Sequence, residues 1–461
     1  MTPLPGARDV QASQLRLFDR EEHQPLPADS GSSHFNDPSF AGNKTLPVHR
    51  WVPWIAGFSA DFVRDVVSRY MSHNGVVLDP FAGIGTTLVE AVASGHDAVG
   101  FEINPYAVLA CRAKIDAHRI RVGRLQAEML RFRRFYDEKV ATDCVPRSSP
   151  PKGFKTRSAF YSPRVLRKVL ILQDFVDTIE DCDVRDLFRL AFASTMVRYS
   201  NYSYEPSLGR RVSAGRSEIQ DFPVGEKILS KLSEIAEDIS WLQERPGIRE
   251  STARIVHDSF FKYEAYLEPE SVDLVVTSPP YLNNYHYNRN TRPHLYWLGY
   301  VEKPQDFGLL EHSNFGKYWQ TVREQEAVEL DFDLPNTDLA EKLEMLRTIK
   351  PERGIYGGKG WANYAATYFN DCHRFSQGIK YSLKPGGVAL VVIGNSILQG
   401  VPIATDLYVG RIAECVGLEL VRIDVPRATR VGNSIIQSDV RVVKARDTHQ
   451  LYEAIVELRK P

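Results

Sequence analysis

The sequence predicts an α/β fold in which a parallel sheet ends in an antiparallel pair and carries a mainly helical insertion. Short apolar runs bounded by turn residues alternate with helical apolar spacing, which is typical of strand–helix–strand units. Most of these runs end at an acidic residue. Between residues 116 and 252 the alternation gives way to mostly helical patterns, and this interruption predicts the insertion.

Composition limits the protein class. The chain has 461 residues, 43% of them hydrophobic, with 57 Lys+Arg against 58 Asp+Glu and a formal net charge of −1. At about 150 residues per domain, the length predicts two or three domains. The sequence contains neither an apolar run of about 18 residues nor a secretory leader, so we expect no membrane contact and a cytoplasmic location. Five cysteines without a C-x-x-C pair argue against a disulfide scaffold, and we expect no metal site.

Residues 1–45 are rich in Pro, Ser, Gly and Asp, which predicts a flexible tail. An isolated apolar cluster lies within it, formed by Gln14, Leu15, Leu17 and Phe18. This cluster resembles the peptide with which bacterial proteins bind the replication sliding clamp, so the clamp is a candidate partner. Alternatively, the tail folds back onto its own domain.

The first half of the predicted core is one strand–helix–strand unit. A helix is expected over 61–70, followed by a strand over 76–78 that ends at Asp79. A second helix over 86–94 leads to a strand over 98–101 that ends at Glu102. Such a unit requires its two strands to be parallel neighbours in a sheet.

The second half resumes after the helical insertion. A strand over 254–257 ends at Asp258, and another over 272–276 leads into residues 277–281. After a loop-rich insertion, a helix and a strand are expected, and two segments with period-2 spacing would form the antiparallel pair. The expected ranges are 364–383 for the helix, 388–393 for the strand, and 418–423 and 440–443 for the pair. The predicted domains are a core at 46–115 and 253–446, its loop-rich insertion at 282–360, and the helical insertion at 116–252 as a candidate target-recognition region.

Residues 79–87 join a buried strand to a helix, the position at which ligands bind parallel sheets. Gly83 and Gly85 would let the backbone turn and approach a ligand, and Glu102 could accept hydrogen bonds from ribose hydroxyls. A nicotinamide site would show a third glycine, where this sequence has Thr86-Thr87. A ligand without phosphate but with an amino-acid group fits better, and S-adenosylmethionine is such a ligand.

These residues resemble the DNA methyltransferases that modify cytosine-N4 or adenine-N6. The match runs through His49-Arg50-Trp51, Phe58-Ser59, residues 79–87 and residues 100–105. The resemblance implies a Rossmann-like class I methyltransferase core that binds S-adenosylmethionine. On its own, Asp258 could equally cap a strand end, but its order in the chain favours a position near the adenine. The cofactor-binding candidates are Asp79, Pro80, Phe81, Gly83, Gly85, Thr86, Glu102, Asn104 and Asp258.

The catalytic candidates are Ser278, Pro279, Pro280 and Tyr281. Two consecutive prolines fix φ and remove two donors, so the backbone carbonyls are held rigidly. The Ser278 hydroxyl and the Pro279 carbonyl could accept the hydrogens of an exocyclic amine, while Tyr281 stacks on the base. Within the family, Ser at the first position resembles the cytosine-N4 enzymes, whereas Asp or Asn resembles the adenine-N6 enzymes. No Pro-Cys dipeptide occurs, so the nucleophile of cytosine-C5 methyltransferases is absent.

A base inside a duplex cannot reach such a loop, so it must be flipped out. The DNA-binding candidates are Asn283, Asn284, Tyr285, Arg289, Arg210 and Arg211, although 283–290 could also be a polar surface loop. Residues 147–173 contain seven basic residues and no acidic one, whereas 324–344 form an acidic stretch with eight acidic residues and one lysine. We expect the basic stretches to face DNA and the acidic stretch to lie away from it or to guard the cleft.

The sequence therefore predicts a site-specific methyltransferase that modifies N4 of a flipped cytosine in double-stranded DNA, within a restriction–modification or defence system. No nuclease signature is visible, so a cognate restriction endonuclease would be a separate chain. Three alternatives remain open: a DNA adenine-N6 methyltransferase, an RNA amino-methyltransferase, and a non-catalytic DNA-binding subunit. The recognition sequence and the insertion that reads it are not predicted.

Overall fold

The structure is a computed structural model, which describes residues 34–54, 57–142, 144–204, 208–245, 251–282, 287–429 and 451–461. Two sets of predicted contact residues lie outside these ranges. They are the clamp-binding candidates Gln14, Leu15, Leu17 and Phe18, and the DNA-binding candidates Asn283, Asn284 and Tyr285.

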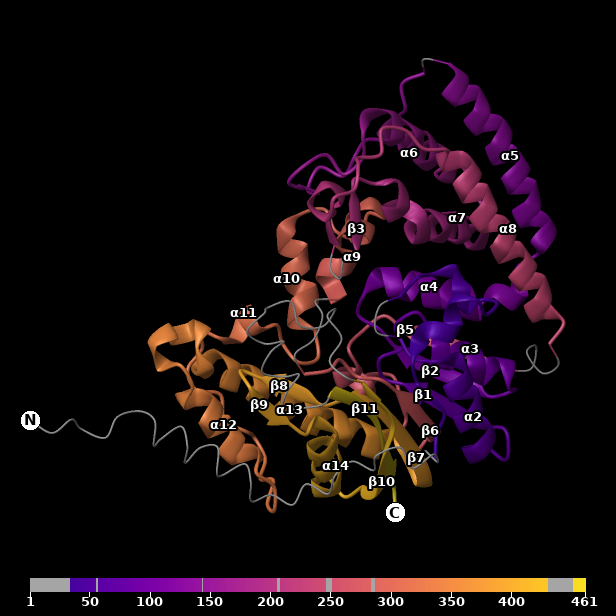
Figure 1. The fold of residues 1–461 in the computed structure, drawn as a ribbon. Helices are drawn as coiled ribbons and strands as arrows, with labels where there is room; N and C mark the ends of the chain where they lie inside the picture. The colour runs from indigo at the N-terminus through magenta and orange to yellow at the C-terminus, as the bar shows by residue number, and fades with distance from the viewer. Residues whose placement is uncertain are drawn as a thin grey trace, which may run out of the picture. The chain divides into compact units, whose positions relative to one another are not determined.

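Among the described residues, seven strands form one sheet with the order β10-β11-β7-β6-β1-β2-β5 (Figure 1). The strands from β7 to β5 pair in parallel, and β11 is antiparallel to both β7 and β10. This topology confirms the predicted fold class. The strands are β1 (Val76–Asp79), β2 (Asp97–Phe101), β5 (Ala253–Val256), β6 (Val272–Thr277), β7 (Leu383–Gly394), β10 (Glu419–Thr429) and β11 (Leu451–Arg459).

The antiparallel strand β11 is one that the sequence patterns missed. The predicted segment 418–423 lies at the start of β10, whereas 440–443 fall outside the described residues. The observed partner of β10 is β11, beyond residue 446, where the predicted core ended. Leu, Glu and Ala dominate β11 and favour helix, so pairing with two neighbouring strands overrides local propensity there.

Helices cover both faces of the sheet. Side chains alternate along the strands, so Val77 and Leu274 belong to one apolar cluster while Leu78 and Val275 belong to the other. The first cluster is covered by α2 (Ala60–Tyr70), α3 (Thr86–Ala93) and α4 (Pro105–Ile115). The second is covered by η7 (Phe260–Ala265), α13 (Gly358–Ser382) and α14 (Thr405–Cys415).

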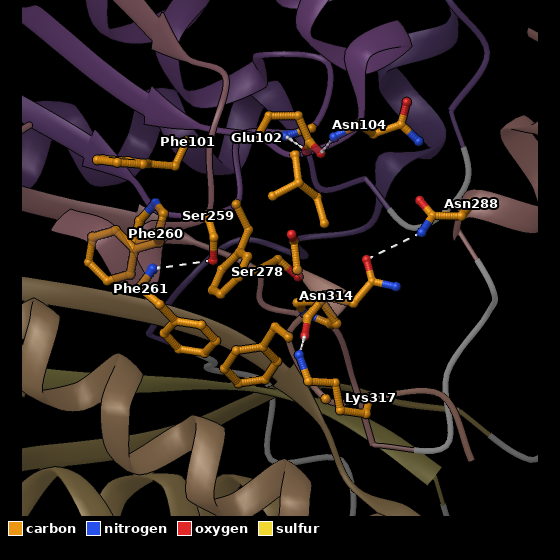
Figure 2. Close-up of a pocket in the computed structure, with 18 of the residues that line it drawn as sticks. Phe101, Glu102, Asn104, Ser259, Phe260, Phe261, Ser278, Asn288, Asn314 and Lys317 are labelled. Carbon is orange, nitrogen blue, oxygen red and sulfur yellow. Dashed lines mark hydrogen bonds between the residues drawn. The ribbon is translucent and has the colours of Figure 1, made fainter. Parts of the chain in front are cut away.

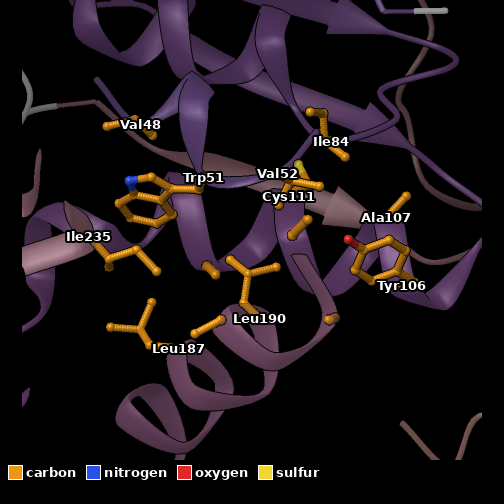
Figure 3. Close-up of a cluster of buried hydrophobic side chains, with 14 of the residues drawn as sticks. Val48, Trp51, Val52, Ile84, Tyr106, Ala107, Cys111, Leu187, Leu190 and Ile235 are labelled. Carbon is orange, nitrogen blue, oxygen red and sulfur yellow. The ribbon is translucent and has the colours of Figure 1, made fainter. Parts of the chain in front are cut away.

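The first insertion is mainly helical and shares a core with the sheet. Figure 3 shows Leu187 and Leu190 from the insertion beside Cys111 of α4 in one buried cluster. Asp238 of the insertion accepts hydrogen bonds from Arg50 Nη2 at 2.6 Å and from Trp51 Nε1 at 2.9 Å. The insertion is therefore built onto the core. It comprises α5 (Val122–Ala141), α6 (Pro163–Val176), α7 (Cys182–Thr195), α8 (Val224–Gln243) and the hairpin of β3 (Tyr202–Tyr204) and β4 (Leu208–Arg210).

The second insertion contains more helix than predicted. Its acidic stretch is partly neutralised, because Arg347 pairs with Glu329 at 2.9 Å and with Glu344 at 3.3 Å. Its helices are α9 (Tyr287–Trp297), α10 (Pro304–His312), α11 (Trp319–Val322), α12 (Leu339–Thr348) and η8 (Pro351–Tyr356).

Short elements complete the described chain. The 3₁₀ turns are η2 (Phe40–Lys44), η3 (His49–Trp51), η4 (Ala117–Arg119), η5 (Met196–Tyr199) and η6 (Arg211–Ala214), and a small hairpin comprises β8 (Ser396–Leu398) and β9 (Val401–Ile403). Within the part of the chain that the structure describes, no helix has both the length and the apolar character needed to cross a membrane.

Candidate active site

A pocket lies at the carboxyl ends of β1, β2, β5 and β6, where the strand order reverses. The chain passes from β1 to β2 and β5 on one side, while β6 pairs with β1 on the other. Open α/β sheets bind ligands at such a switch point. Figure 2 shows part of the lining, and the residues that follow the four strands are Pro80, Phe81, Gly83, Glu102, Ile103, Asn104, Asp258, Ser259, Phe260, Phe261, Ser278, Pro280 and Tyr281.

The Glu102 carboxylate is fixed at the pocket wall by two backbone hydrogen bonds. It accepts the Gly83 N–H at 3.0 Å and the Asn104 N–H at 2.7 Å, one on each oxygen. A carboxylate oxygen has two lone pairs, so each oxygen keeps one position for a ligand hydroxyl. Burial raises the pKa of Glu102 to about 7.

The two glycines of the loop after β1 serve different purposes. Gly83, with φ of +50°, lines the pocket, and a Cβ there would lie 3.4 Å from Trp54 Nε1. Gly85, with φ of +83°, precedes α3, and a Cβ there would lie only 2.6 Å from Cys111 Sγ. We predicted that both glycines admit a ligand. Gly85 does not line the pocket, and its missing side chain allows the loop to pack against α4.

Asp79 lies beneath the loop and is not among the residues that line the pocket. Its side chain is fully buried and accepts hydrogen bonds from the hydroxyls of Thr87 and Thr277, both at 2.7 Å. Burial raises the pKa of Asp79 to about 6. The carboxylate therefore joins the end of β1 to the end of β6. Thr86 is likewise buried, at the first position of α3.

Asn104 and Asp258 line the pocket but also make structural hydrogen bonds. The Asn104 side chain caps α4 by accepting the Tyr106 N–H at 3.1 Å, and it donates to Thr291 Oγ1 at 2.8 Å. Asp258 accepts hydrogen bonds from Lys262 and Tyr266. Partial burial opposes them, but these bonds hold the pKa of Asp258 below its usual range.

Hydrogen bonds with α13 and β11 hold the loop after β6 in place. The Tyr368 hydroxyl of α13 donates to the Pro280 carbonyl at 2.9 Å, and the Tyr281 hydroxyl donates to Glu453 Oε1 of β11 at 3.1 Å. The Tyr281 ring also lies against Gly394, where a Cβ would come within 3.0 Å of it. Two strands and a helix therefore fix the orientation of this loop.

Three of the four catalytic candidates line the pocket, and the fourth does not. Ser278, Pro280 and Tyr281 line the pocket together with Glu102. Pro279 is buried and is not among the lining residues.

The sequence patterns missed the wall that the second insertion supplies. The Asn288 side chain donates to Asn314 Oδ1 at 3.4 Å, and Lys317 Nζ donates to the Asn314 carbonyl at 3.1 Å. Aromatic rings close the same wall, since Phe81 packs against Phe315 with centroids 5.1 Å apart. Asn288 lies within the segment 283–290 that was a candidate for DNA contact. The missed lining residues are Trp54, Phe101, Ile103, Ser259, Phe260, Phe261, Ser313, Asn314, Phe315, Gly316, Lys317, Tyr318 and Tyr364. The segment 313–318 carries no motif that could have identified it.

The described DNA-binding candidates lie outside the pocket lining. Arg289 is exposed on α9, directly after the pocket residue Asn288. Arg210 ends β4 and Arg211 begins η6, and Arg211 Nε donates to the Ser217 carbonyl at 3.0 Å. Within the described ranges, no group of three or more His, Cys, Asp or Glu side chains could hold a metal ion.

Comparison with known proteins finds a family model that matches part of the chain and several distant relatives. The N6/N4 methyltransferase family model, described as DNA methylase, matches residues 39–112. The type II methyltransferase M.BsoBI of Geobacillus stearothermophilus is 24% identical over 434 residues, which cover 86% of this chain and 83% of that protein. The type II methyltransferase M.AvaI of Anabaena variabilis is 25% identical over 418 residues, covering 86% and 84%.

A solved structure, the rRNA methyltransferase aviRa from Streptomyces viridochromogenes, aligns over 92% of this chain and 94% of that chain at 8% identity and a TM-score of 0.31. A score this low supports no conclusion, so the fold class rests on the observed strand order. The family model covers the loop after β1 and Glu102, and the two relatives extend over most of the chain. Residues 39–112 therefore match the N6/N4 DNA methylase model, and the chain is distantly similar over most of its length to the type II methyltransferases M.BsoBI and M.AvaI.

Proposed function

We propose that this chain transfers a methyl group from S-adenosylmethionine to the N4 amine of a cytosine flipped out of double-stranded DNA, as the modifying enzyme of a restriction–modification system. The observation that carries the proposal is that Ser278 and Tyr281 share one pocket with Glu102. An acceptor group for an amine and an acceptor group for ribose hydroxyls thus face a common space at the switch point of the sheet.

Several features of the pocket support the cofactor, for which the family implies S-adenosylmethionine. Glu102 keeps one free position on each oxygen, which suits the two ribose hydroxyls. Gly83 leaves space above the loop for the methionine part, and Asp258 with Phe260 forms the wall proposed for the adenine. When bound, this cofactor supplies an electrophilic methyl group on a sulfonium.

We assign Asp79, Thr86 and Gly85 to a supporting role. Asp79 and Thr86 are buried, and neither they nor Gly85 line the pocket. Through Thr87 and Thr277, Asp79 fixes the loop that would hold the cofactor relative to the loop that would hold the base.

The loop after β6 would activate the amine by positioning. The lone pair of an exocyclic amine is delocalised into the ring, so its nitrogen must become more tetrahedral before it attacks. The Ser278 hydroxyl and the Pro279 carbonyl would each accept a hydrogen bond from the amine, and Tyr281 would stack on the base. Since Tyr368 and Glu453 fix this loop, the acceptors are held in place before the base arrives.

Aromatic side chains would keep water away from the sulfonium. Phe315 lies between Phe81, with centroids 5.1 Å apart, and Phe261, with centroids 6.0 Å apart. A wall that excludes water strengthens the electrostatic interactions inside the pocket and limits hydrolysis of the cofactor.

The proposal can be tested by incubating the protein and S-adenosylmethionine with unmethylated plasmid DNA, then digesting the DNA to nucleosides for mass spectrometry. We expect N4-methylcytosine without N6-methyladenine, and no product from the Ser278→Ala variant. N6-methyladenine alone would overturn the choice of base. Methylation of RNA but not of duplex DNA would overturn the substrate, and cofactor binding without transfer to either would indicate a non-catalytic subunit.

A further inference from the structure

We propose that a basic face beside the pocket binds the phosphates of duplex DNA that flank the target base. The basic face consists of Lys152, Lys155 and Arg157 from the first insertion, Arg210 and Arg211 from its hairpin, and Arg289 from α9. This inference rests on the proposed function, because it assigns the duplex a path to the same pocket.

The loop of residues 152–158 is attached to α9. Arg292 Nη2 of α9 donates to the Lys155 carbonyl at 3.1 Å. The Arg292 guanidinium also lies 5.3 Å from the ring centroid of Phe154 and 5.4 Å from that of Tyr296. Phe154 and Tyr296 pack on each other with centroids 5.5 Å apart. A segment more than 130 residues earlier in the chain is thus fixed on the helix that follows the catalytic loop.

The hairpin of β3 and β4 joins the same assembly. The Tyr204 hydroxyl donates to the Asn290 carbonyl of α9 at 2.8 Å. The Ser158 N–H donates to the Tyr202 hydroxyl at 3.2 Å, and Phe160 stacks on Tyr202 with centroids 5.5 Å apart. The loop, the hairpin and α9 therefore form one surface.

The charges on this surface are uncompensated. Lys152, Lys155, Arg157 and Arg289 are exposed, and none of the six basic residues forms an ion pair within the described part of the chain. Residues 147–173 contain no acidic side chain at all.

Two basic residues elsewhere in the first insertion are neutralised by acidic partners. Arg124 pairs with Asp181 at 3.0 Å, and Lys168 pairs with Asp221 at 2.6 Å. The six residues of the basic face have no such ion pair in the described part of the chain, and unpaired Lys and Arg gathered on one surface are the usual footprint of a phosphate backbone.

The basic face begins next to the pocket. Asn288 lines the pocket, Arg289 follows it, and Arg292 contacts the 152–158 loop one helical turn later. Four helical residues span about 6 Å, which is about two base-pair steps of duplex DNA. Phosphates close to a flipped base would therefore lie within reach of this face, where they can set the register of the duplex without reading its sequence.

The experiment compares the full chain with the triple variant Lys152→Ala/Lys155→Ala/Arg157→Ala. The probe is a fluorescent 30-base-pair duplex of mixed sequence, bound over a series of NaCl concentrations. Each lost phosphate contact reduces the slope of log Kd against log salt by about 0.9, so we expect a loss of about 2 to 3 in slope. We also expect at least about a 10-fold weaker affinity at low salt.

The matched control is Arg133→Ala/Arg134→Ala, which removes exposed charges from α5, a helix that packs against α6 and α8. We expect no change in slope or affinity. Lys152→Arg/Lys155→Arg keeps the charge and should bind like the unaltered chain. For the triple variant, kcat at saturating plasmid DNA and the Kd for S-adenosylmethionine should stay unchanged, which excludes misfolding.

If the triple variant shows an unchanged salt slope and an unchanged affinity, the basic face does not bind DNA phosphates and the proposal is wrong. Tighter binding of a matched RNA duplex than of DNA by the unaltered chain would overturn its assignment to DNA. If the unaltered chain methylates no DNA, the proposed function fails, while the salt slopes still decide whether the basic face binds a duplex.

Discussion

The half of the pocket that we propose for the cofactor is built from strand ends, whereas the half proposed for the base also needs a distant insertion. The cofactor half comprises Pro80, Phe81, Gly83 and the segments 102–104 and 258–261, which follow β1, β2 and β5 within a few residues. The base half combines Ser278, Pro280 and Tyr281 with Asn288, the segment 313–318 and Tyr364. The difference indicates that one half is determined by the sheet, while the other depends on an insertion that can change without altering the sheet.

The largest effect should come from the base half. Replacing Ser278 and Tyr281 together by Ala removes the hydroxyl acceptor and the stacking ring, and we expect kcat to fall by about 1,000-fold or more. The Kd for S-adenosylmethionine, measured by calorimetry, should change by less than about 2-fold. Ser271→Ala, directly before the start of β6, is the control. Undiminished methylation would refute the mechanism, and lost cofactor binding would mean that the two halves are not separable.

The cofactor half should respond to pH through Glu102. Its pKa of about 7 means that it is mostly protonated at pH 6 and ionised at pH 8. Because the ionised form accepts ribose hydroxyls, affinity for S-adenosylmethionine should rise about 10-fold between these pH values, relative to Glu102→Gln. At pH 8 the variant should bind about 10- to 100-fold more weakly.

Comparing both proteins at each pH cancels the titration of the cofactor itself. Thermal unfolding of Glu102→Gln serves as a further control, since the new amide nitrogen would face one of two backbone N–H groups. A ratio of affinities that does not vary with pH would show that the Glu102 charge plays no part in binding.

The smallest effect should come from the wall that the second insertion supplies. Asn314→Ala removes the acceptor of the Asn288 amide, and a neutral hydrogen bond contributes about 1 kcal/mol. We therefore expect KM for DNA to rise by about 2- to 10-fold, with kcat and cofactor affinity unchanged. If cofactor affinity changes instead, the segment 313–318 belongs to the cofactor half, and the proposed division of the pocket is wrong.

The fold class could be predicted because its evidence is local. The strands that end at Asp79, Glu102 and Thr277 are short apolar runs followed by turn residues, and the structure contains each of them. The loop after β1 was identified for the same reason. Strand β11 was missed because its residues favour helix, and only its two neighbours in the sheet make it a strand.

The site was predicted less completely than the fold. Gly83 and Gly85 are equivalent in the sequence, and only the distance to Cys111 separates the glycine that lines the pocket from the one that packs. Asn314 and Lys317 could not be identified, because they reach the pocket through a long insertion without a motif. Residues brought together across such separations carry no signal in a single sequence.

The hydrogen bond from Thr277 to Asp79 has a consequence for rate. It crosses between β1 and β6, whose backbones pair directly at Val77–Leu274 and Leu78–Val275. The spacing between the proposed donor and acceptor sites is thus built into adjacent strands before either ligand binds. Much of the entropy cost of bringing two reactants together is then met during folding, so the effective molarity of the reacting groups is a property of the sheet. Tight binding of either ligand alone would not raise it.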